Sequence, residues 1–319
     1  MNTLGSLGER EIVRHILEII NTIPPKGPGD DASAIDLGEF YLVLSTDMVS
    51  RKTHAPKGMT FWQLGWFLAA INYSDIAAMG AKPIGLLTSL GFPRETELVD
   101  MLEVIKGAKA CSEYVGGEIL GGDTKETSDI TLAGTAVGIV GKKEILLRKG
   151  AKVGDILAVT GTLGLPAAGL HAIKNNLTCE KCKKALFEPM PRVREGLTLS
   201  SSGFVTSCID ISDGLAISLR HLSEASGVSF EVVWNKIPVD PAVKRIARLA
   251  KLDEKELVLY VGGDYQLLFT VTPKGWYHLK KRLGSAISQI GAVVDREKNT
   301  LVINGKRFEI EDRGYEHFK

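Results

Sequence analysis

Seven aspartates stand beside glycine or hydroxyl residues at the ends of expected strands, or on an expected helix. They are Asp30, Asp31, Asp47, Asp75, Asp123, Asp210 and Asp213. Each one alone is typical of a turn or a helix N-cap. Carboxylates brought together repel one another unless cations intervene, and hard cations such as Mg²⁺ prefer oxygen ligands and bridge substrate phosphates. As a set, the aspartates therefore favour a magnesium and polyphosphate site.

Asp210 and Asp213 flank Ser212 where an expected strand, residues 207–211, passes into an expected helix, residues 215–225. Backbone amides at such a helix start can hold an anion. Simple capping of the helix by Ser212 or Asp213 explains the pattern equally well.

Two common nucleotide-binding motifs are absent from the sequence. The Gly-Lys pairs at 141–142 and 305–306 are not followed by Ser or Thr, which excludes a Walker A loop. No G-x-G-x-x-G turn follows an expected strand, so a dinucleotide-binding fold loses its main support.

Cysteine and histidine offer few metal ligands. Cys179 and Cys182 form a single C-x-x-C with no second pair nearby, so a closed zinc site cannot be assembled locally. Cys111 and Cys208 are expected to be buried thiols. His54, seven residues after Asp47, is the one histidine placed near an aspartate of the set.

The elements that position these residues alternate between strands and helices. A strand over residues 40–45 is expected to end at Thr46 and Asp47, and a helix over residues 60–79 carries Asn72 and Asp75 on one face. A brief strand over residues 118–120 leads into Gly122 and Asp123. Both halves are mixed α/β, which predicts two domains, residues 1–148 and 149–319.

Composition excludes several classes of protein. The 319 residues carry 39 Lys and Arg against 38 Asp and Glu, a net charge of +1, so no field attracts nucleic acid or an anionic membrane. The most apolar stretch is interrupted by polar residues and falls short of a spanning helix. Four cysteines make no disulfide scaffold, and the first residues do not form a signal sequence, so a cytoplasmic protein is expected.

Several of these segments, in order, closely resemble the motifs of thiamine-monophosphate kinases, and the match spans nearly the whole chain. The segments are Gly29-Asp30-Asp31-Ala32, Ser45-Thr46-Asp47, residues 72–81 (NYSDIAAMGA), Gly121-Gly122-Asp123-Thr124, Arg148-Lys149-Gly150-Ala151, residues 210–215 (DISDGL) and Asp264-Tyr265. That family shares a superfamily with aminoimidazole ribonucleotide synthetase and selenophosphate synthetase.

The resemblance implies an ATP- and Mg²⁺-dependent kinase that converts thiamine monophosphate to thiamine diphosphate by direct in-line transfer. It also implies a homodimer whose N-terminal domains, which bind ATP and metal, pair their sheets into a β-barrel. The implied metal residues are Asp31, Ser45, Thr46, Asp47, Asp75, Asp123, Asp210 and Asp213. The implied nucleotide residues are Gly122, Asp123, Arg148 and Ser212, and the implied substrate residues are His54, Gly263 and Tyr315.

One position departs from the family. Where the family reads Gly-Gly-Glu-Asp-Tyr, alignment on Asp264-Tyr265 puts Gly263 at the position of the substrate-pocket glutamate. Loss of that carboxylate weakens recognition of the cationic thiazolium unless Asp264 or another acid substitutes. Tyr315 or Phe318 in the C-terminal tail is expected to stack on the thiamine rings.

Two alternatives to the kinase remain at this point. One is another ATP-dependent synthetase of the same superfamily, although the reactive Cys or selenocysteine of selenophosphate synthetase is absent, since the first cysteine is Cys111. The other is a non-catalytic nucleotide-binding homologue, which Gly263 favours.

Overall fold

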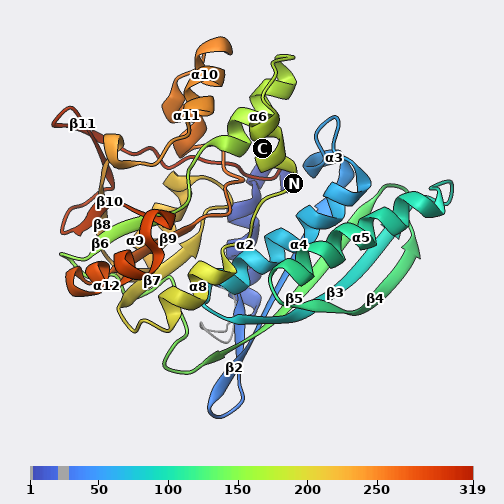
Figure 1. Ribbon diagram of the computed structural model, residues 1–319, viewed down its shortest axis with the longest axis horizontal. Coiled ribbons are helices and arrows are strands. Elements are labelled where there is room, and N and C mark those ends of the chain that lie inside the picture. The colour runs from blue at the N-terminus through green and yellow to red at the C-terminus, as the bar shows by residue number, and fades with distance from the viewer. Residues whose placement is uncertain (1–2, 21–28, 319) are drawn as a thin grey trace.

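The computed structural model describes residues 3–20 and 29–318, which form two sheets flanked by helices (Figure 1). The first sheet has the strand order β1-β2-β5-β3-β4, antiparallel except for the parallel pair β3 and β4. Its strands are β1 (Ser33–Asp36), β2 (Phe40–Ser50), β3 (Lys82–Phe92), β4 (Glu118–Glu126) and β5 (Thr131–Gly141). The expected mixed α/β class is confirmed.

Two helices, α4 (Phe61–Ala78) and α5 (Leu98–Tyr114), cover one face of this sheet (Figure 1). The α4 helix is apolar on all sides, and every residue from 64 to 74 is buried, as expected of a helix at the centre of a core. Thr60 caps its N-terminus by accepting a hydrogen bond from the Gln63 amide. The expected helix over residues 60–79 is therefore confirmed.

The second sheet has the order β12-β11-β8-β10-β6-β9-β7 and is mostly antiparallel, with β8 and β11 parallel. Its strands are β6 (Ile156–Thr160), β7 (Val205–Asp210), β8 (Ser229–Val233), β9 (Leu267–Val271), β10 (Ile287–Val294), β11 (Thr300–Ile303) and β12 (Lys306–Glu309). The accompanying helices are α6 (Leu165–Lys174), α7 (Glu180–Phe187), α8 (Val193–Ser200), α9 (Leu215–Ser226), α10 (Pro241–Leu249), α11 (Glu254–Leu259) and α12 (Pro273–Leu283).

Short helices complete the fold: α1 (Leu4–Leu7) and α2 (Glu9–Ile20) precede the first sheet, and α3 (Arg51–His54) follows β2. None of the helices in the described part of the chain is long and apolar enough to cross a membrane.

Two strands extend beyond their expected ends. The β2 strand continues to Ser50, and β4 continues to Glu126, so Asp47 and Asp123 lie within strands instead of after them. In both cases a long ladder with a neighbouring strand supplies backbone hydrogen bonds that the local sequence does not reveal.

Glycine determines how closely α4 and α5 approach. A Cβ at Gly107 would lie 1.8 Å from the carbonyl oxygen of Trp62, and a Cβ at Gly65 would lie 1.8 Å from that of Val104. The two backbones are therefore in direct contact, and this contact fixes the position of the helix that carries Asn72 and Asp75.

We expect Gly107→Ala to lower the free energy of unfolding by about 2–4 kcal/mol, because the new methyl group must push α5 away from α4. Denaturant unfolding at 25 °C measures the change. The control is Gly5→Ala in α1, where the nearest atom to the new Cβ is 3.9 Å away, so stability should hardly change. Equal stability of the Gly107→Ala protein and the unmodified protein would contradict this packing.

Candidate active site

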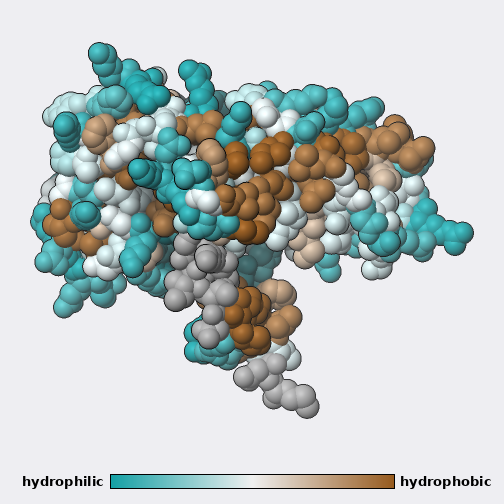
Figure 2. Space-filling model, turned by 90° about the horizontal axis from the view of Figure 1, so that it is seen from below, coloured by the Kyte–Doolittle hydropathy of each residue, from teal (hydrophilic) through white to brown (hydrophobic). Residues whose placement is uncertain are grey.

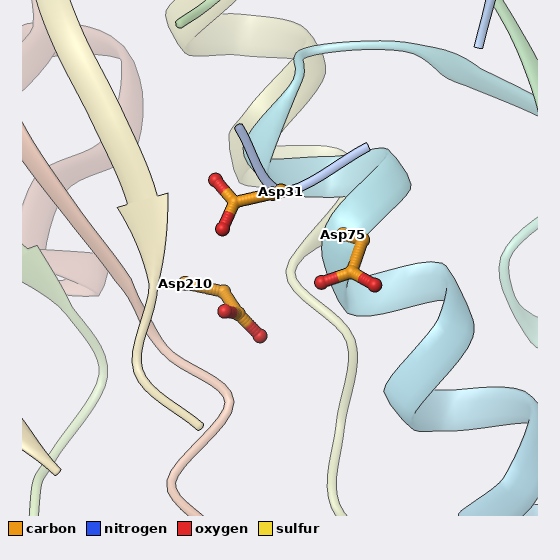
Figure 3. Close-up of side chains that lie close together, drawn as sticks. All are labelled: Asp31, Asp75 and Asp210. Carbon is orange, nitrogen blue, oxygen red and sulfur yellow. The ribbon is translucent and has the colours of Figure 1, made fainter. Parts of the chain in front are cut away.

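Three carboxylates meet between the two sheets (Figure 3). Asp31 precedes β1, Asp75 lies near the end of α4, and Asp210 ends β7. One oxygen from each lies within 4.8 Å of the others. The Asp31 side chain is 1% exposed and Asp210 is 4% exposed, so the cluster is largely shielded from water.

Hydroxyl and amide groups from neighbouring elements orient the cluster. Ser74 on α4 donates a 2.6 Å hydrogen bond to Asp210 Oδ2, and Ser45 on β2 donates one to Asp75 Oδ2. The Asp47 amide donates to Asn72 Oδ1 at 3.0 Å. The α4 helix therefore links the carboxylates of both sheets.

Arg148 lies beside the acidic cluster, in the segment between the two sheets. Its guanidinium donates to Asp31 Oδ1 at 2.7 Å, and its backbone amide donates to Asp30 at 3.1 Å. Burial disfavours the charge on Arg148, but the neighbouring Asp31 carboxylate raises the pKa of Arg148 overall. One guanidinium faces several carboxylates, so negative charge remains in excess.

The excess of negative charge contributes to the raised pKa values of the aspartates. Burial, followed by the charge of Asp31, raises the pKa of Asp210 to about 8, and burial followed by Glu9 raises that of Asp213 to about 6. Burial also raises the pKa of Asp75 well above its usual value, with Asp47 and Asp210 adding to the effect. Asp31 Oδ2 is buried without a hydrogen-bond partner. These oxygen donors and their uncompensated charge suit a hard divalent cation.

Two cavities meet at the cluster, and Asp47 and Asp75 line both of them. One, of about 720 Å³, is bordered by α2, the residues before β1, Arg148 and α9. We call this the Arg148 cavity. The other, of about 660 Å³, is bordered by His54, the loop after α11 and the C-terminal tail, and we call it the His54 cavity.

The wall of the His54 cavity is rich in rings. His54 lies 5.2 Å from the His317 ring, between centroids, and the His317 ring meets Tyr315 edge to face at 5.0 Å. Phe318 and the half-buried Tyr265 also line the cavity. Burial lowers the pKa of His54, which favours its neutral form at this wall.

The loop with Gly263 and Asp264 is where the sequence lacks the glutamate of the family. Gly263 lines the cavity with φ at +83°, a conformation that strains any residue with a side chain. Asp264 is 5% exposed, and its Oδ1 accepts a 2.8 Å hydrogen bond from the Gly164 amide at the start of α6. Asp264 does not line the His54 cavity, so it does not replace the missing glutamate there.

The structure brings together most of the sequence-predicted residues. Those that line one or both cavities are Asp31, Ser45, Thr46, Asp47, Asp75, Arg148, Asp210, Ser212, Asp213, His54, Gly263 and Tyr315. Gly122 and Asp123 lie apart from them, on the outer strand β4. The Asp123 side chain is 60% exposed and faces Lys125 at 3.4 Å.

Sequence reasoning missed two groups of residues at the site. Glu9 and His317 line the His54 cavity although they lie near opposite ends of the chain, and no local pattern connects them. Ser74 carried a detectable signal, because it directly precedes Asp75 in the Asn-x-Ser-Asp motif.

The cysteines play no part in this site. Cys111 and Cys208 are free and buried, as expected. Cys179 and Cys182 form a disulfide at the start of α7, a local bridge that the sequence did not predict.

Comparison with known proteins defines the class. Residues 29–140 match the family model of the AIR synthase related protein N-terminal domain, and residues 152–304 match that of the C-terminal domain. The two matches include Asp31, Asp75 and Asp210 and all strands of the two sheets except β12 and the last residue of β5.

More specific relatives share nearly the whole chain. A thiamine-monophosphate kinase of Methanospirillum hungatei is 38% identical over 305 residues, 95% of this chain and 98% of that protein. One of Pyrococcus horikoshii is 32% identical over 320 residues, 99% of this chain and 98% of that protein. A solved structure described as AaThiL complexed with AMPPCP and TMP has a TM-score of 0.89 at 27% identity and 99% coverage of both chains. The chain belongs to the thiamine-monophosphate kinase family.

The raised aspartate pKa values predict a pH dependence of stability without metal. Between about pH 4 and 8 the folded protein keeps protons that the unfolded chain loses, so the free energy of unfolding falls as pH rises through this window. The free energy of unfolding should therefore decrease between pH 5 and pH 8. We expect this decrease to be about 1–3 kcal/mol smaller in Asp210→Asn, because asparagine carries no charge at either pH.

Denaturant unfolding in a chelating buffer measures this difference at the two pH values. Asp295→Asn, at an exposed position, is the control and should retain the pH dependence of the unmodified protein. The same pH dependence in the Asp210→Asn protein would contradict the raised pKa of Asp210 in the folded protein.

Proposed function

We propose that this protein transfers the γ-phosphoryl group of ATP to thiamine monophosphate, forming thiamine diphosphate. The observation that carries the proposal is the position of the carboxylate cluster where the two cavities meet; Asp75 of the cluster and the neighbouring Asp47 line both cavities. Relatives named as thiamine-monophosphate kinases, and a structural neighbour described with AMPPCP and TMP, support the same pair of substrates.

The cluster residues fit Mg²⁺, as the orphaned Asp31 Oδ2 and the excess negative charge indicate. Asp31, Asp47, Asp75, Asp210 and Asp213 would hold it. The hydroxyls of Ser45 and Thr46 on β2 line the same cavity and would add oxygen ligands to these carboxylates. When bound, Mg²⁺ supplies neutralisation of phosphate charge.

The chain itself contributes positioning. We assign ATP to the Arg148 cavity, where Arg148 would contact the phosphates, and thiamine monophosphate to the ring-lined His54 cavity. The acceptor oxygen is already ionised at neutral pH, so no general base is required, and direct in-line transfer rests on alignment and charge neutralisation. Ser212 lies on the wall of the His54 cavity beside Asp213, where it would contact the transferred phosphate.

The two domains divide this work. We assign dimerisation and most of the ATP- and metal-binding residues to residues 1–148. Residues 149–319 would add Asp210 and Asp213 to the metal-binding set and provide the loops that shape the acceptor side, including Gly263 and Tyr315. Because ATP and phosphate esters are retained within cells, we place the reaction in the cytoplasm.

We expect the protein to convert thiamine monophosphate to thiamine diphosphate only with ATP and Mg²⁺, and Asp47→Asn to lower kcat by about 100-fold or more. The substitution removes a metal-binding charge with little change of shape. Product formation is followed by chromatography. A circular dichroism spectrum like that of the unmodified protein shows that the variant is folded, and full turnover by the folded variant would contradict the proposed metal site.

A homodimer explains the uncovered face of the first sheet. The face opposite α4 exposes apolar side chains, and Figure 2 shows brown side chains gathered over this half of the molecule. The apolar side chains on this face of the sheet include Ile84, Leu87 and Leu120, which are exposed, and Leu42, Val137 and Ile139, which are half-buried. An apolar sheet face of this kind is expected to be covered by a partner.

The dimer would also give Gly122 and Asp123 a role. Asp123 pairs with Ser89 on β3. Ser89 is two residues after Leu87, so both side chains lie on the same face of the sheet, and Asp123 beside Ser89 lies on this uncovered face too. We propose that pairing of the two first sheets forms the expected barrel and brings Gly122 and Asp123 of one protomer toward the Arg148 cavity of its partner.

We expect Leu87→Asp to give a monomer by light scattering at micromolar concentration, because it places a charge in the centre of the apolar face. Leu87 is 43% exposed in the single chain. Leu98→Asp, at an exposed position in the first turn of α5 on the other side of the sheet, is the control and should remain dimeric. A monomeric unmodified protein would contradict the proposed dimer.

A further inference from the structure

The loop at Gly263 places no carboxylate on the wall of the His54 cavity. Thiamine carries a permanent positive charge on its thiazolium ring, and no described residue that lines this cavity is Lys or Arg. Four of the five carboxylates on its wall, Asp47, Asp75, Asp210 and Asp213, belong to the metal cluster. The fifth is Glu9.

Glu9 begins α2 and lies on the cavity wall with the C-terminal tail. Its Oε2 accepts a 3.0 Å hydrogen bond from the His317 amide, and its own amide donates to the His317 carbonyl at 3.3 Å. These two bonds hold the carboxylate beside the rings of Tyr315 and Phe318, which also line the cavity.

The charge of Glu9 is not cancelled by its sequence neighbour. Arg10 pairs with Asp312 at 3.3 Å and with Glu316 at 3.6 Å, outside the cavity. The Glu9 charge acts on the cavity wall: after burial, it is the next cause of the raised pKa of Tyr315, which lines the same cavity.

We propose that Glu9 supplies the carboxylate that recognises the thiazolium cation of thiamine monophosphate, in the role that the family gives to the glutamate absent at position 263. An aromatic wall with one carboxylate binds a planar organic cation through stacking, cation–π attraction and charge. The inference rests on the proposed function and adds a specificity-determining residue to it. The competing explanation is that Glu9 only fastens the C-terminal tail.

Glu9→Gln separates these two roles, because glutamine keeps an acceptor for the His317 amide and loses the charge. We expect KM for thiamine monophosphate to rise about tenfold, with kcat and KM for ATP within about twofold of the unmodified protein. Calorimetric titration with thiamine monophosphate should show the same loss of affinity.

A neutral analogue provides the second readout. In thiophene-containing deazathiamine monophosphate, carbon replaces the charged ring nitrogen, so Glu9→Gln should leave its affinity unchanged. The matched control is Glu316→Gln, which weakens a tail contact with Arg10 outside the cavity and should not discriminate between the charged and neutral ligands.

Two results would overturn the inference and leave the proposed function standing: unchanged affinity for thiamine monophosphate in Glu9→Gln, or an equal loss for the charged and neutral ligands. Unchanged affinity would show that only the hydrogen-bond acceptor for the His317 amide is needed, and an equal loss for both ligands would show that the C-terminal tail has moved. A different result, no binding and no phosphorylation of thiamine monophosphate by the unmodified protein, would overturn the proposed function itself.

Discussion

Mutual repulsion among buried carboxylates is the constraint on which the rest of this structure depends. Asp31, Asp75 and Asp210 come from three distant parts of the chain and place oxygens within 4.8 Å of one another, and Arg148 is the one guanidinium bound to them in the described part of the chain. Such an arrangement is unfavourable without protons or metal ions. The packing of both sheets around α4 must therefore hold the carboxylates in place.

The α4 helix can hold the carboxylates in place because it is buried on every side. Its glycine contact with α5 fixes one side, and the sheet fixes another. Asn72, Ser74 and Asp75 in its last two turns form hydrogen bonds with β2 and β7, so one helix positions residues from both sheets. A rigid scaffold suits a reaction in which positioning and charge neutralisation do most of the work.

The two ends of the chain meet at the His54 cavity. Glu9 and the tail from Tyr315 to Phe318 line one part of its wall, and two hydrogen bonds join them: the Glu9 amide donates to the His317 carbonyl, and the His317 amide donates to the Glu9 carboxylate. In the proposed function, substrate recognition would depend on segments separated by about the full length of the chain, while metal binding would depend on residues held by the two sheets.

The sequence by itself determined the local chemistry: the aspartate motifs, the helix that carries Asp75, the alternation of strands and helices, and the resemblance that named the substrates. Only the tertiary structure decided three other matters. It placed Asp47 and Asp123 within strands, because ladder partners far along the chain extend β2 and β4. It placed Asp264 against the start of α6, away from the cavity, and gave Gly263 a left-handed backbone. It also brought Glu9 to the wall of the His54 cavity. The sequence could not predict this position, because contacts between the two chain ends leave no periodic or local signal in the amino-acid sequence.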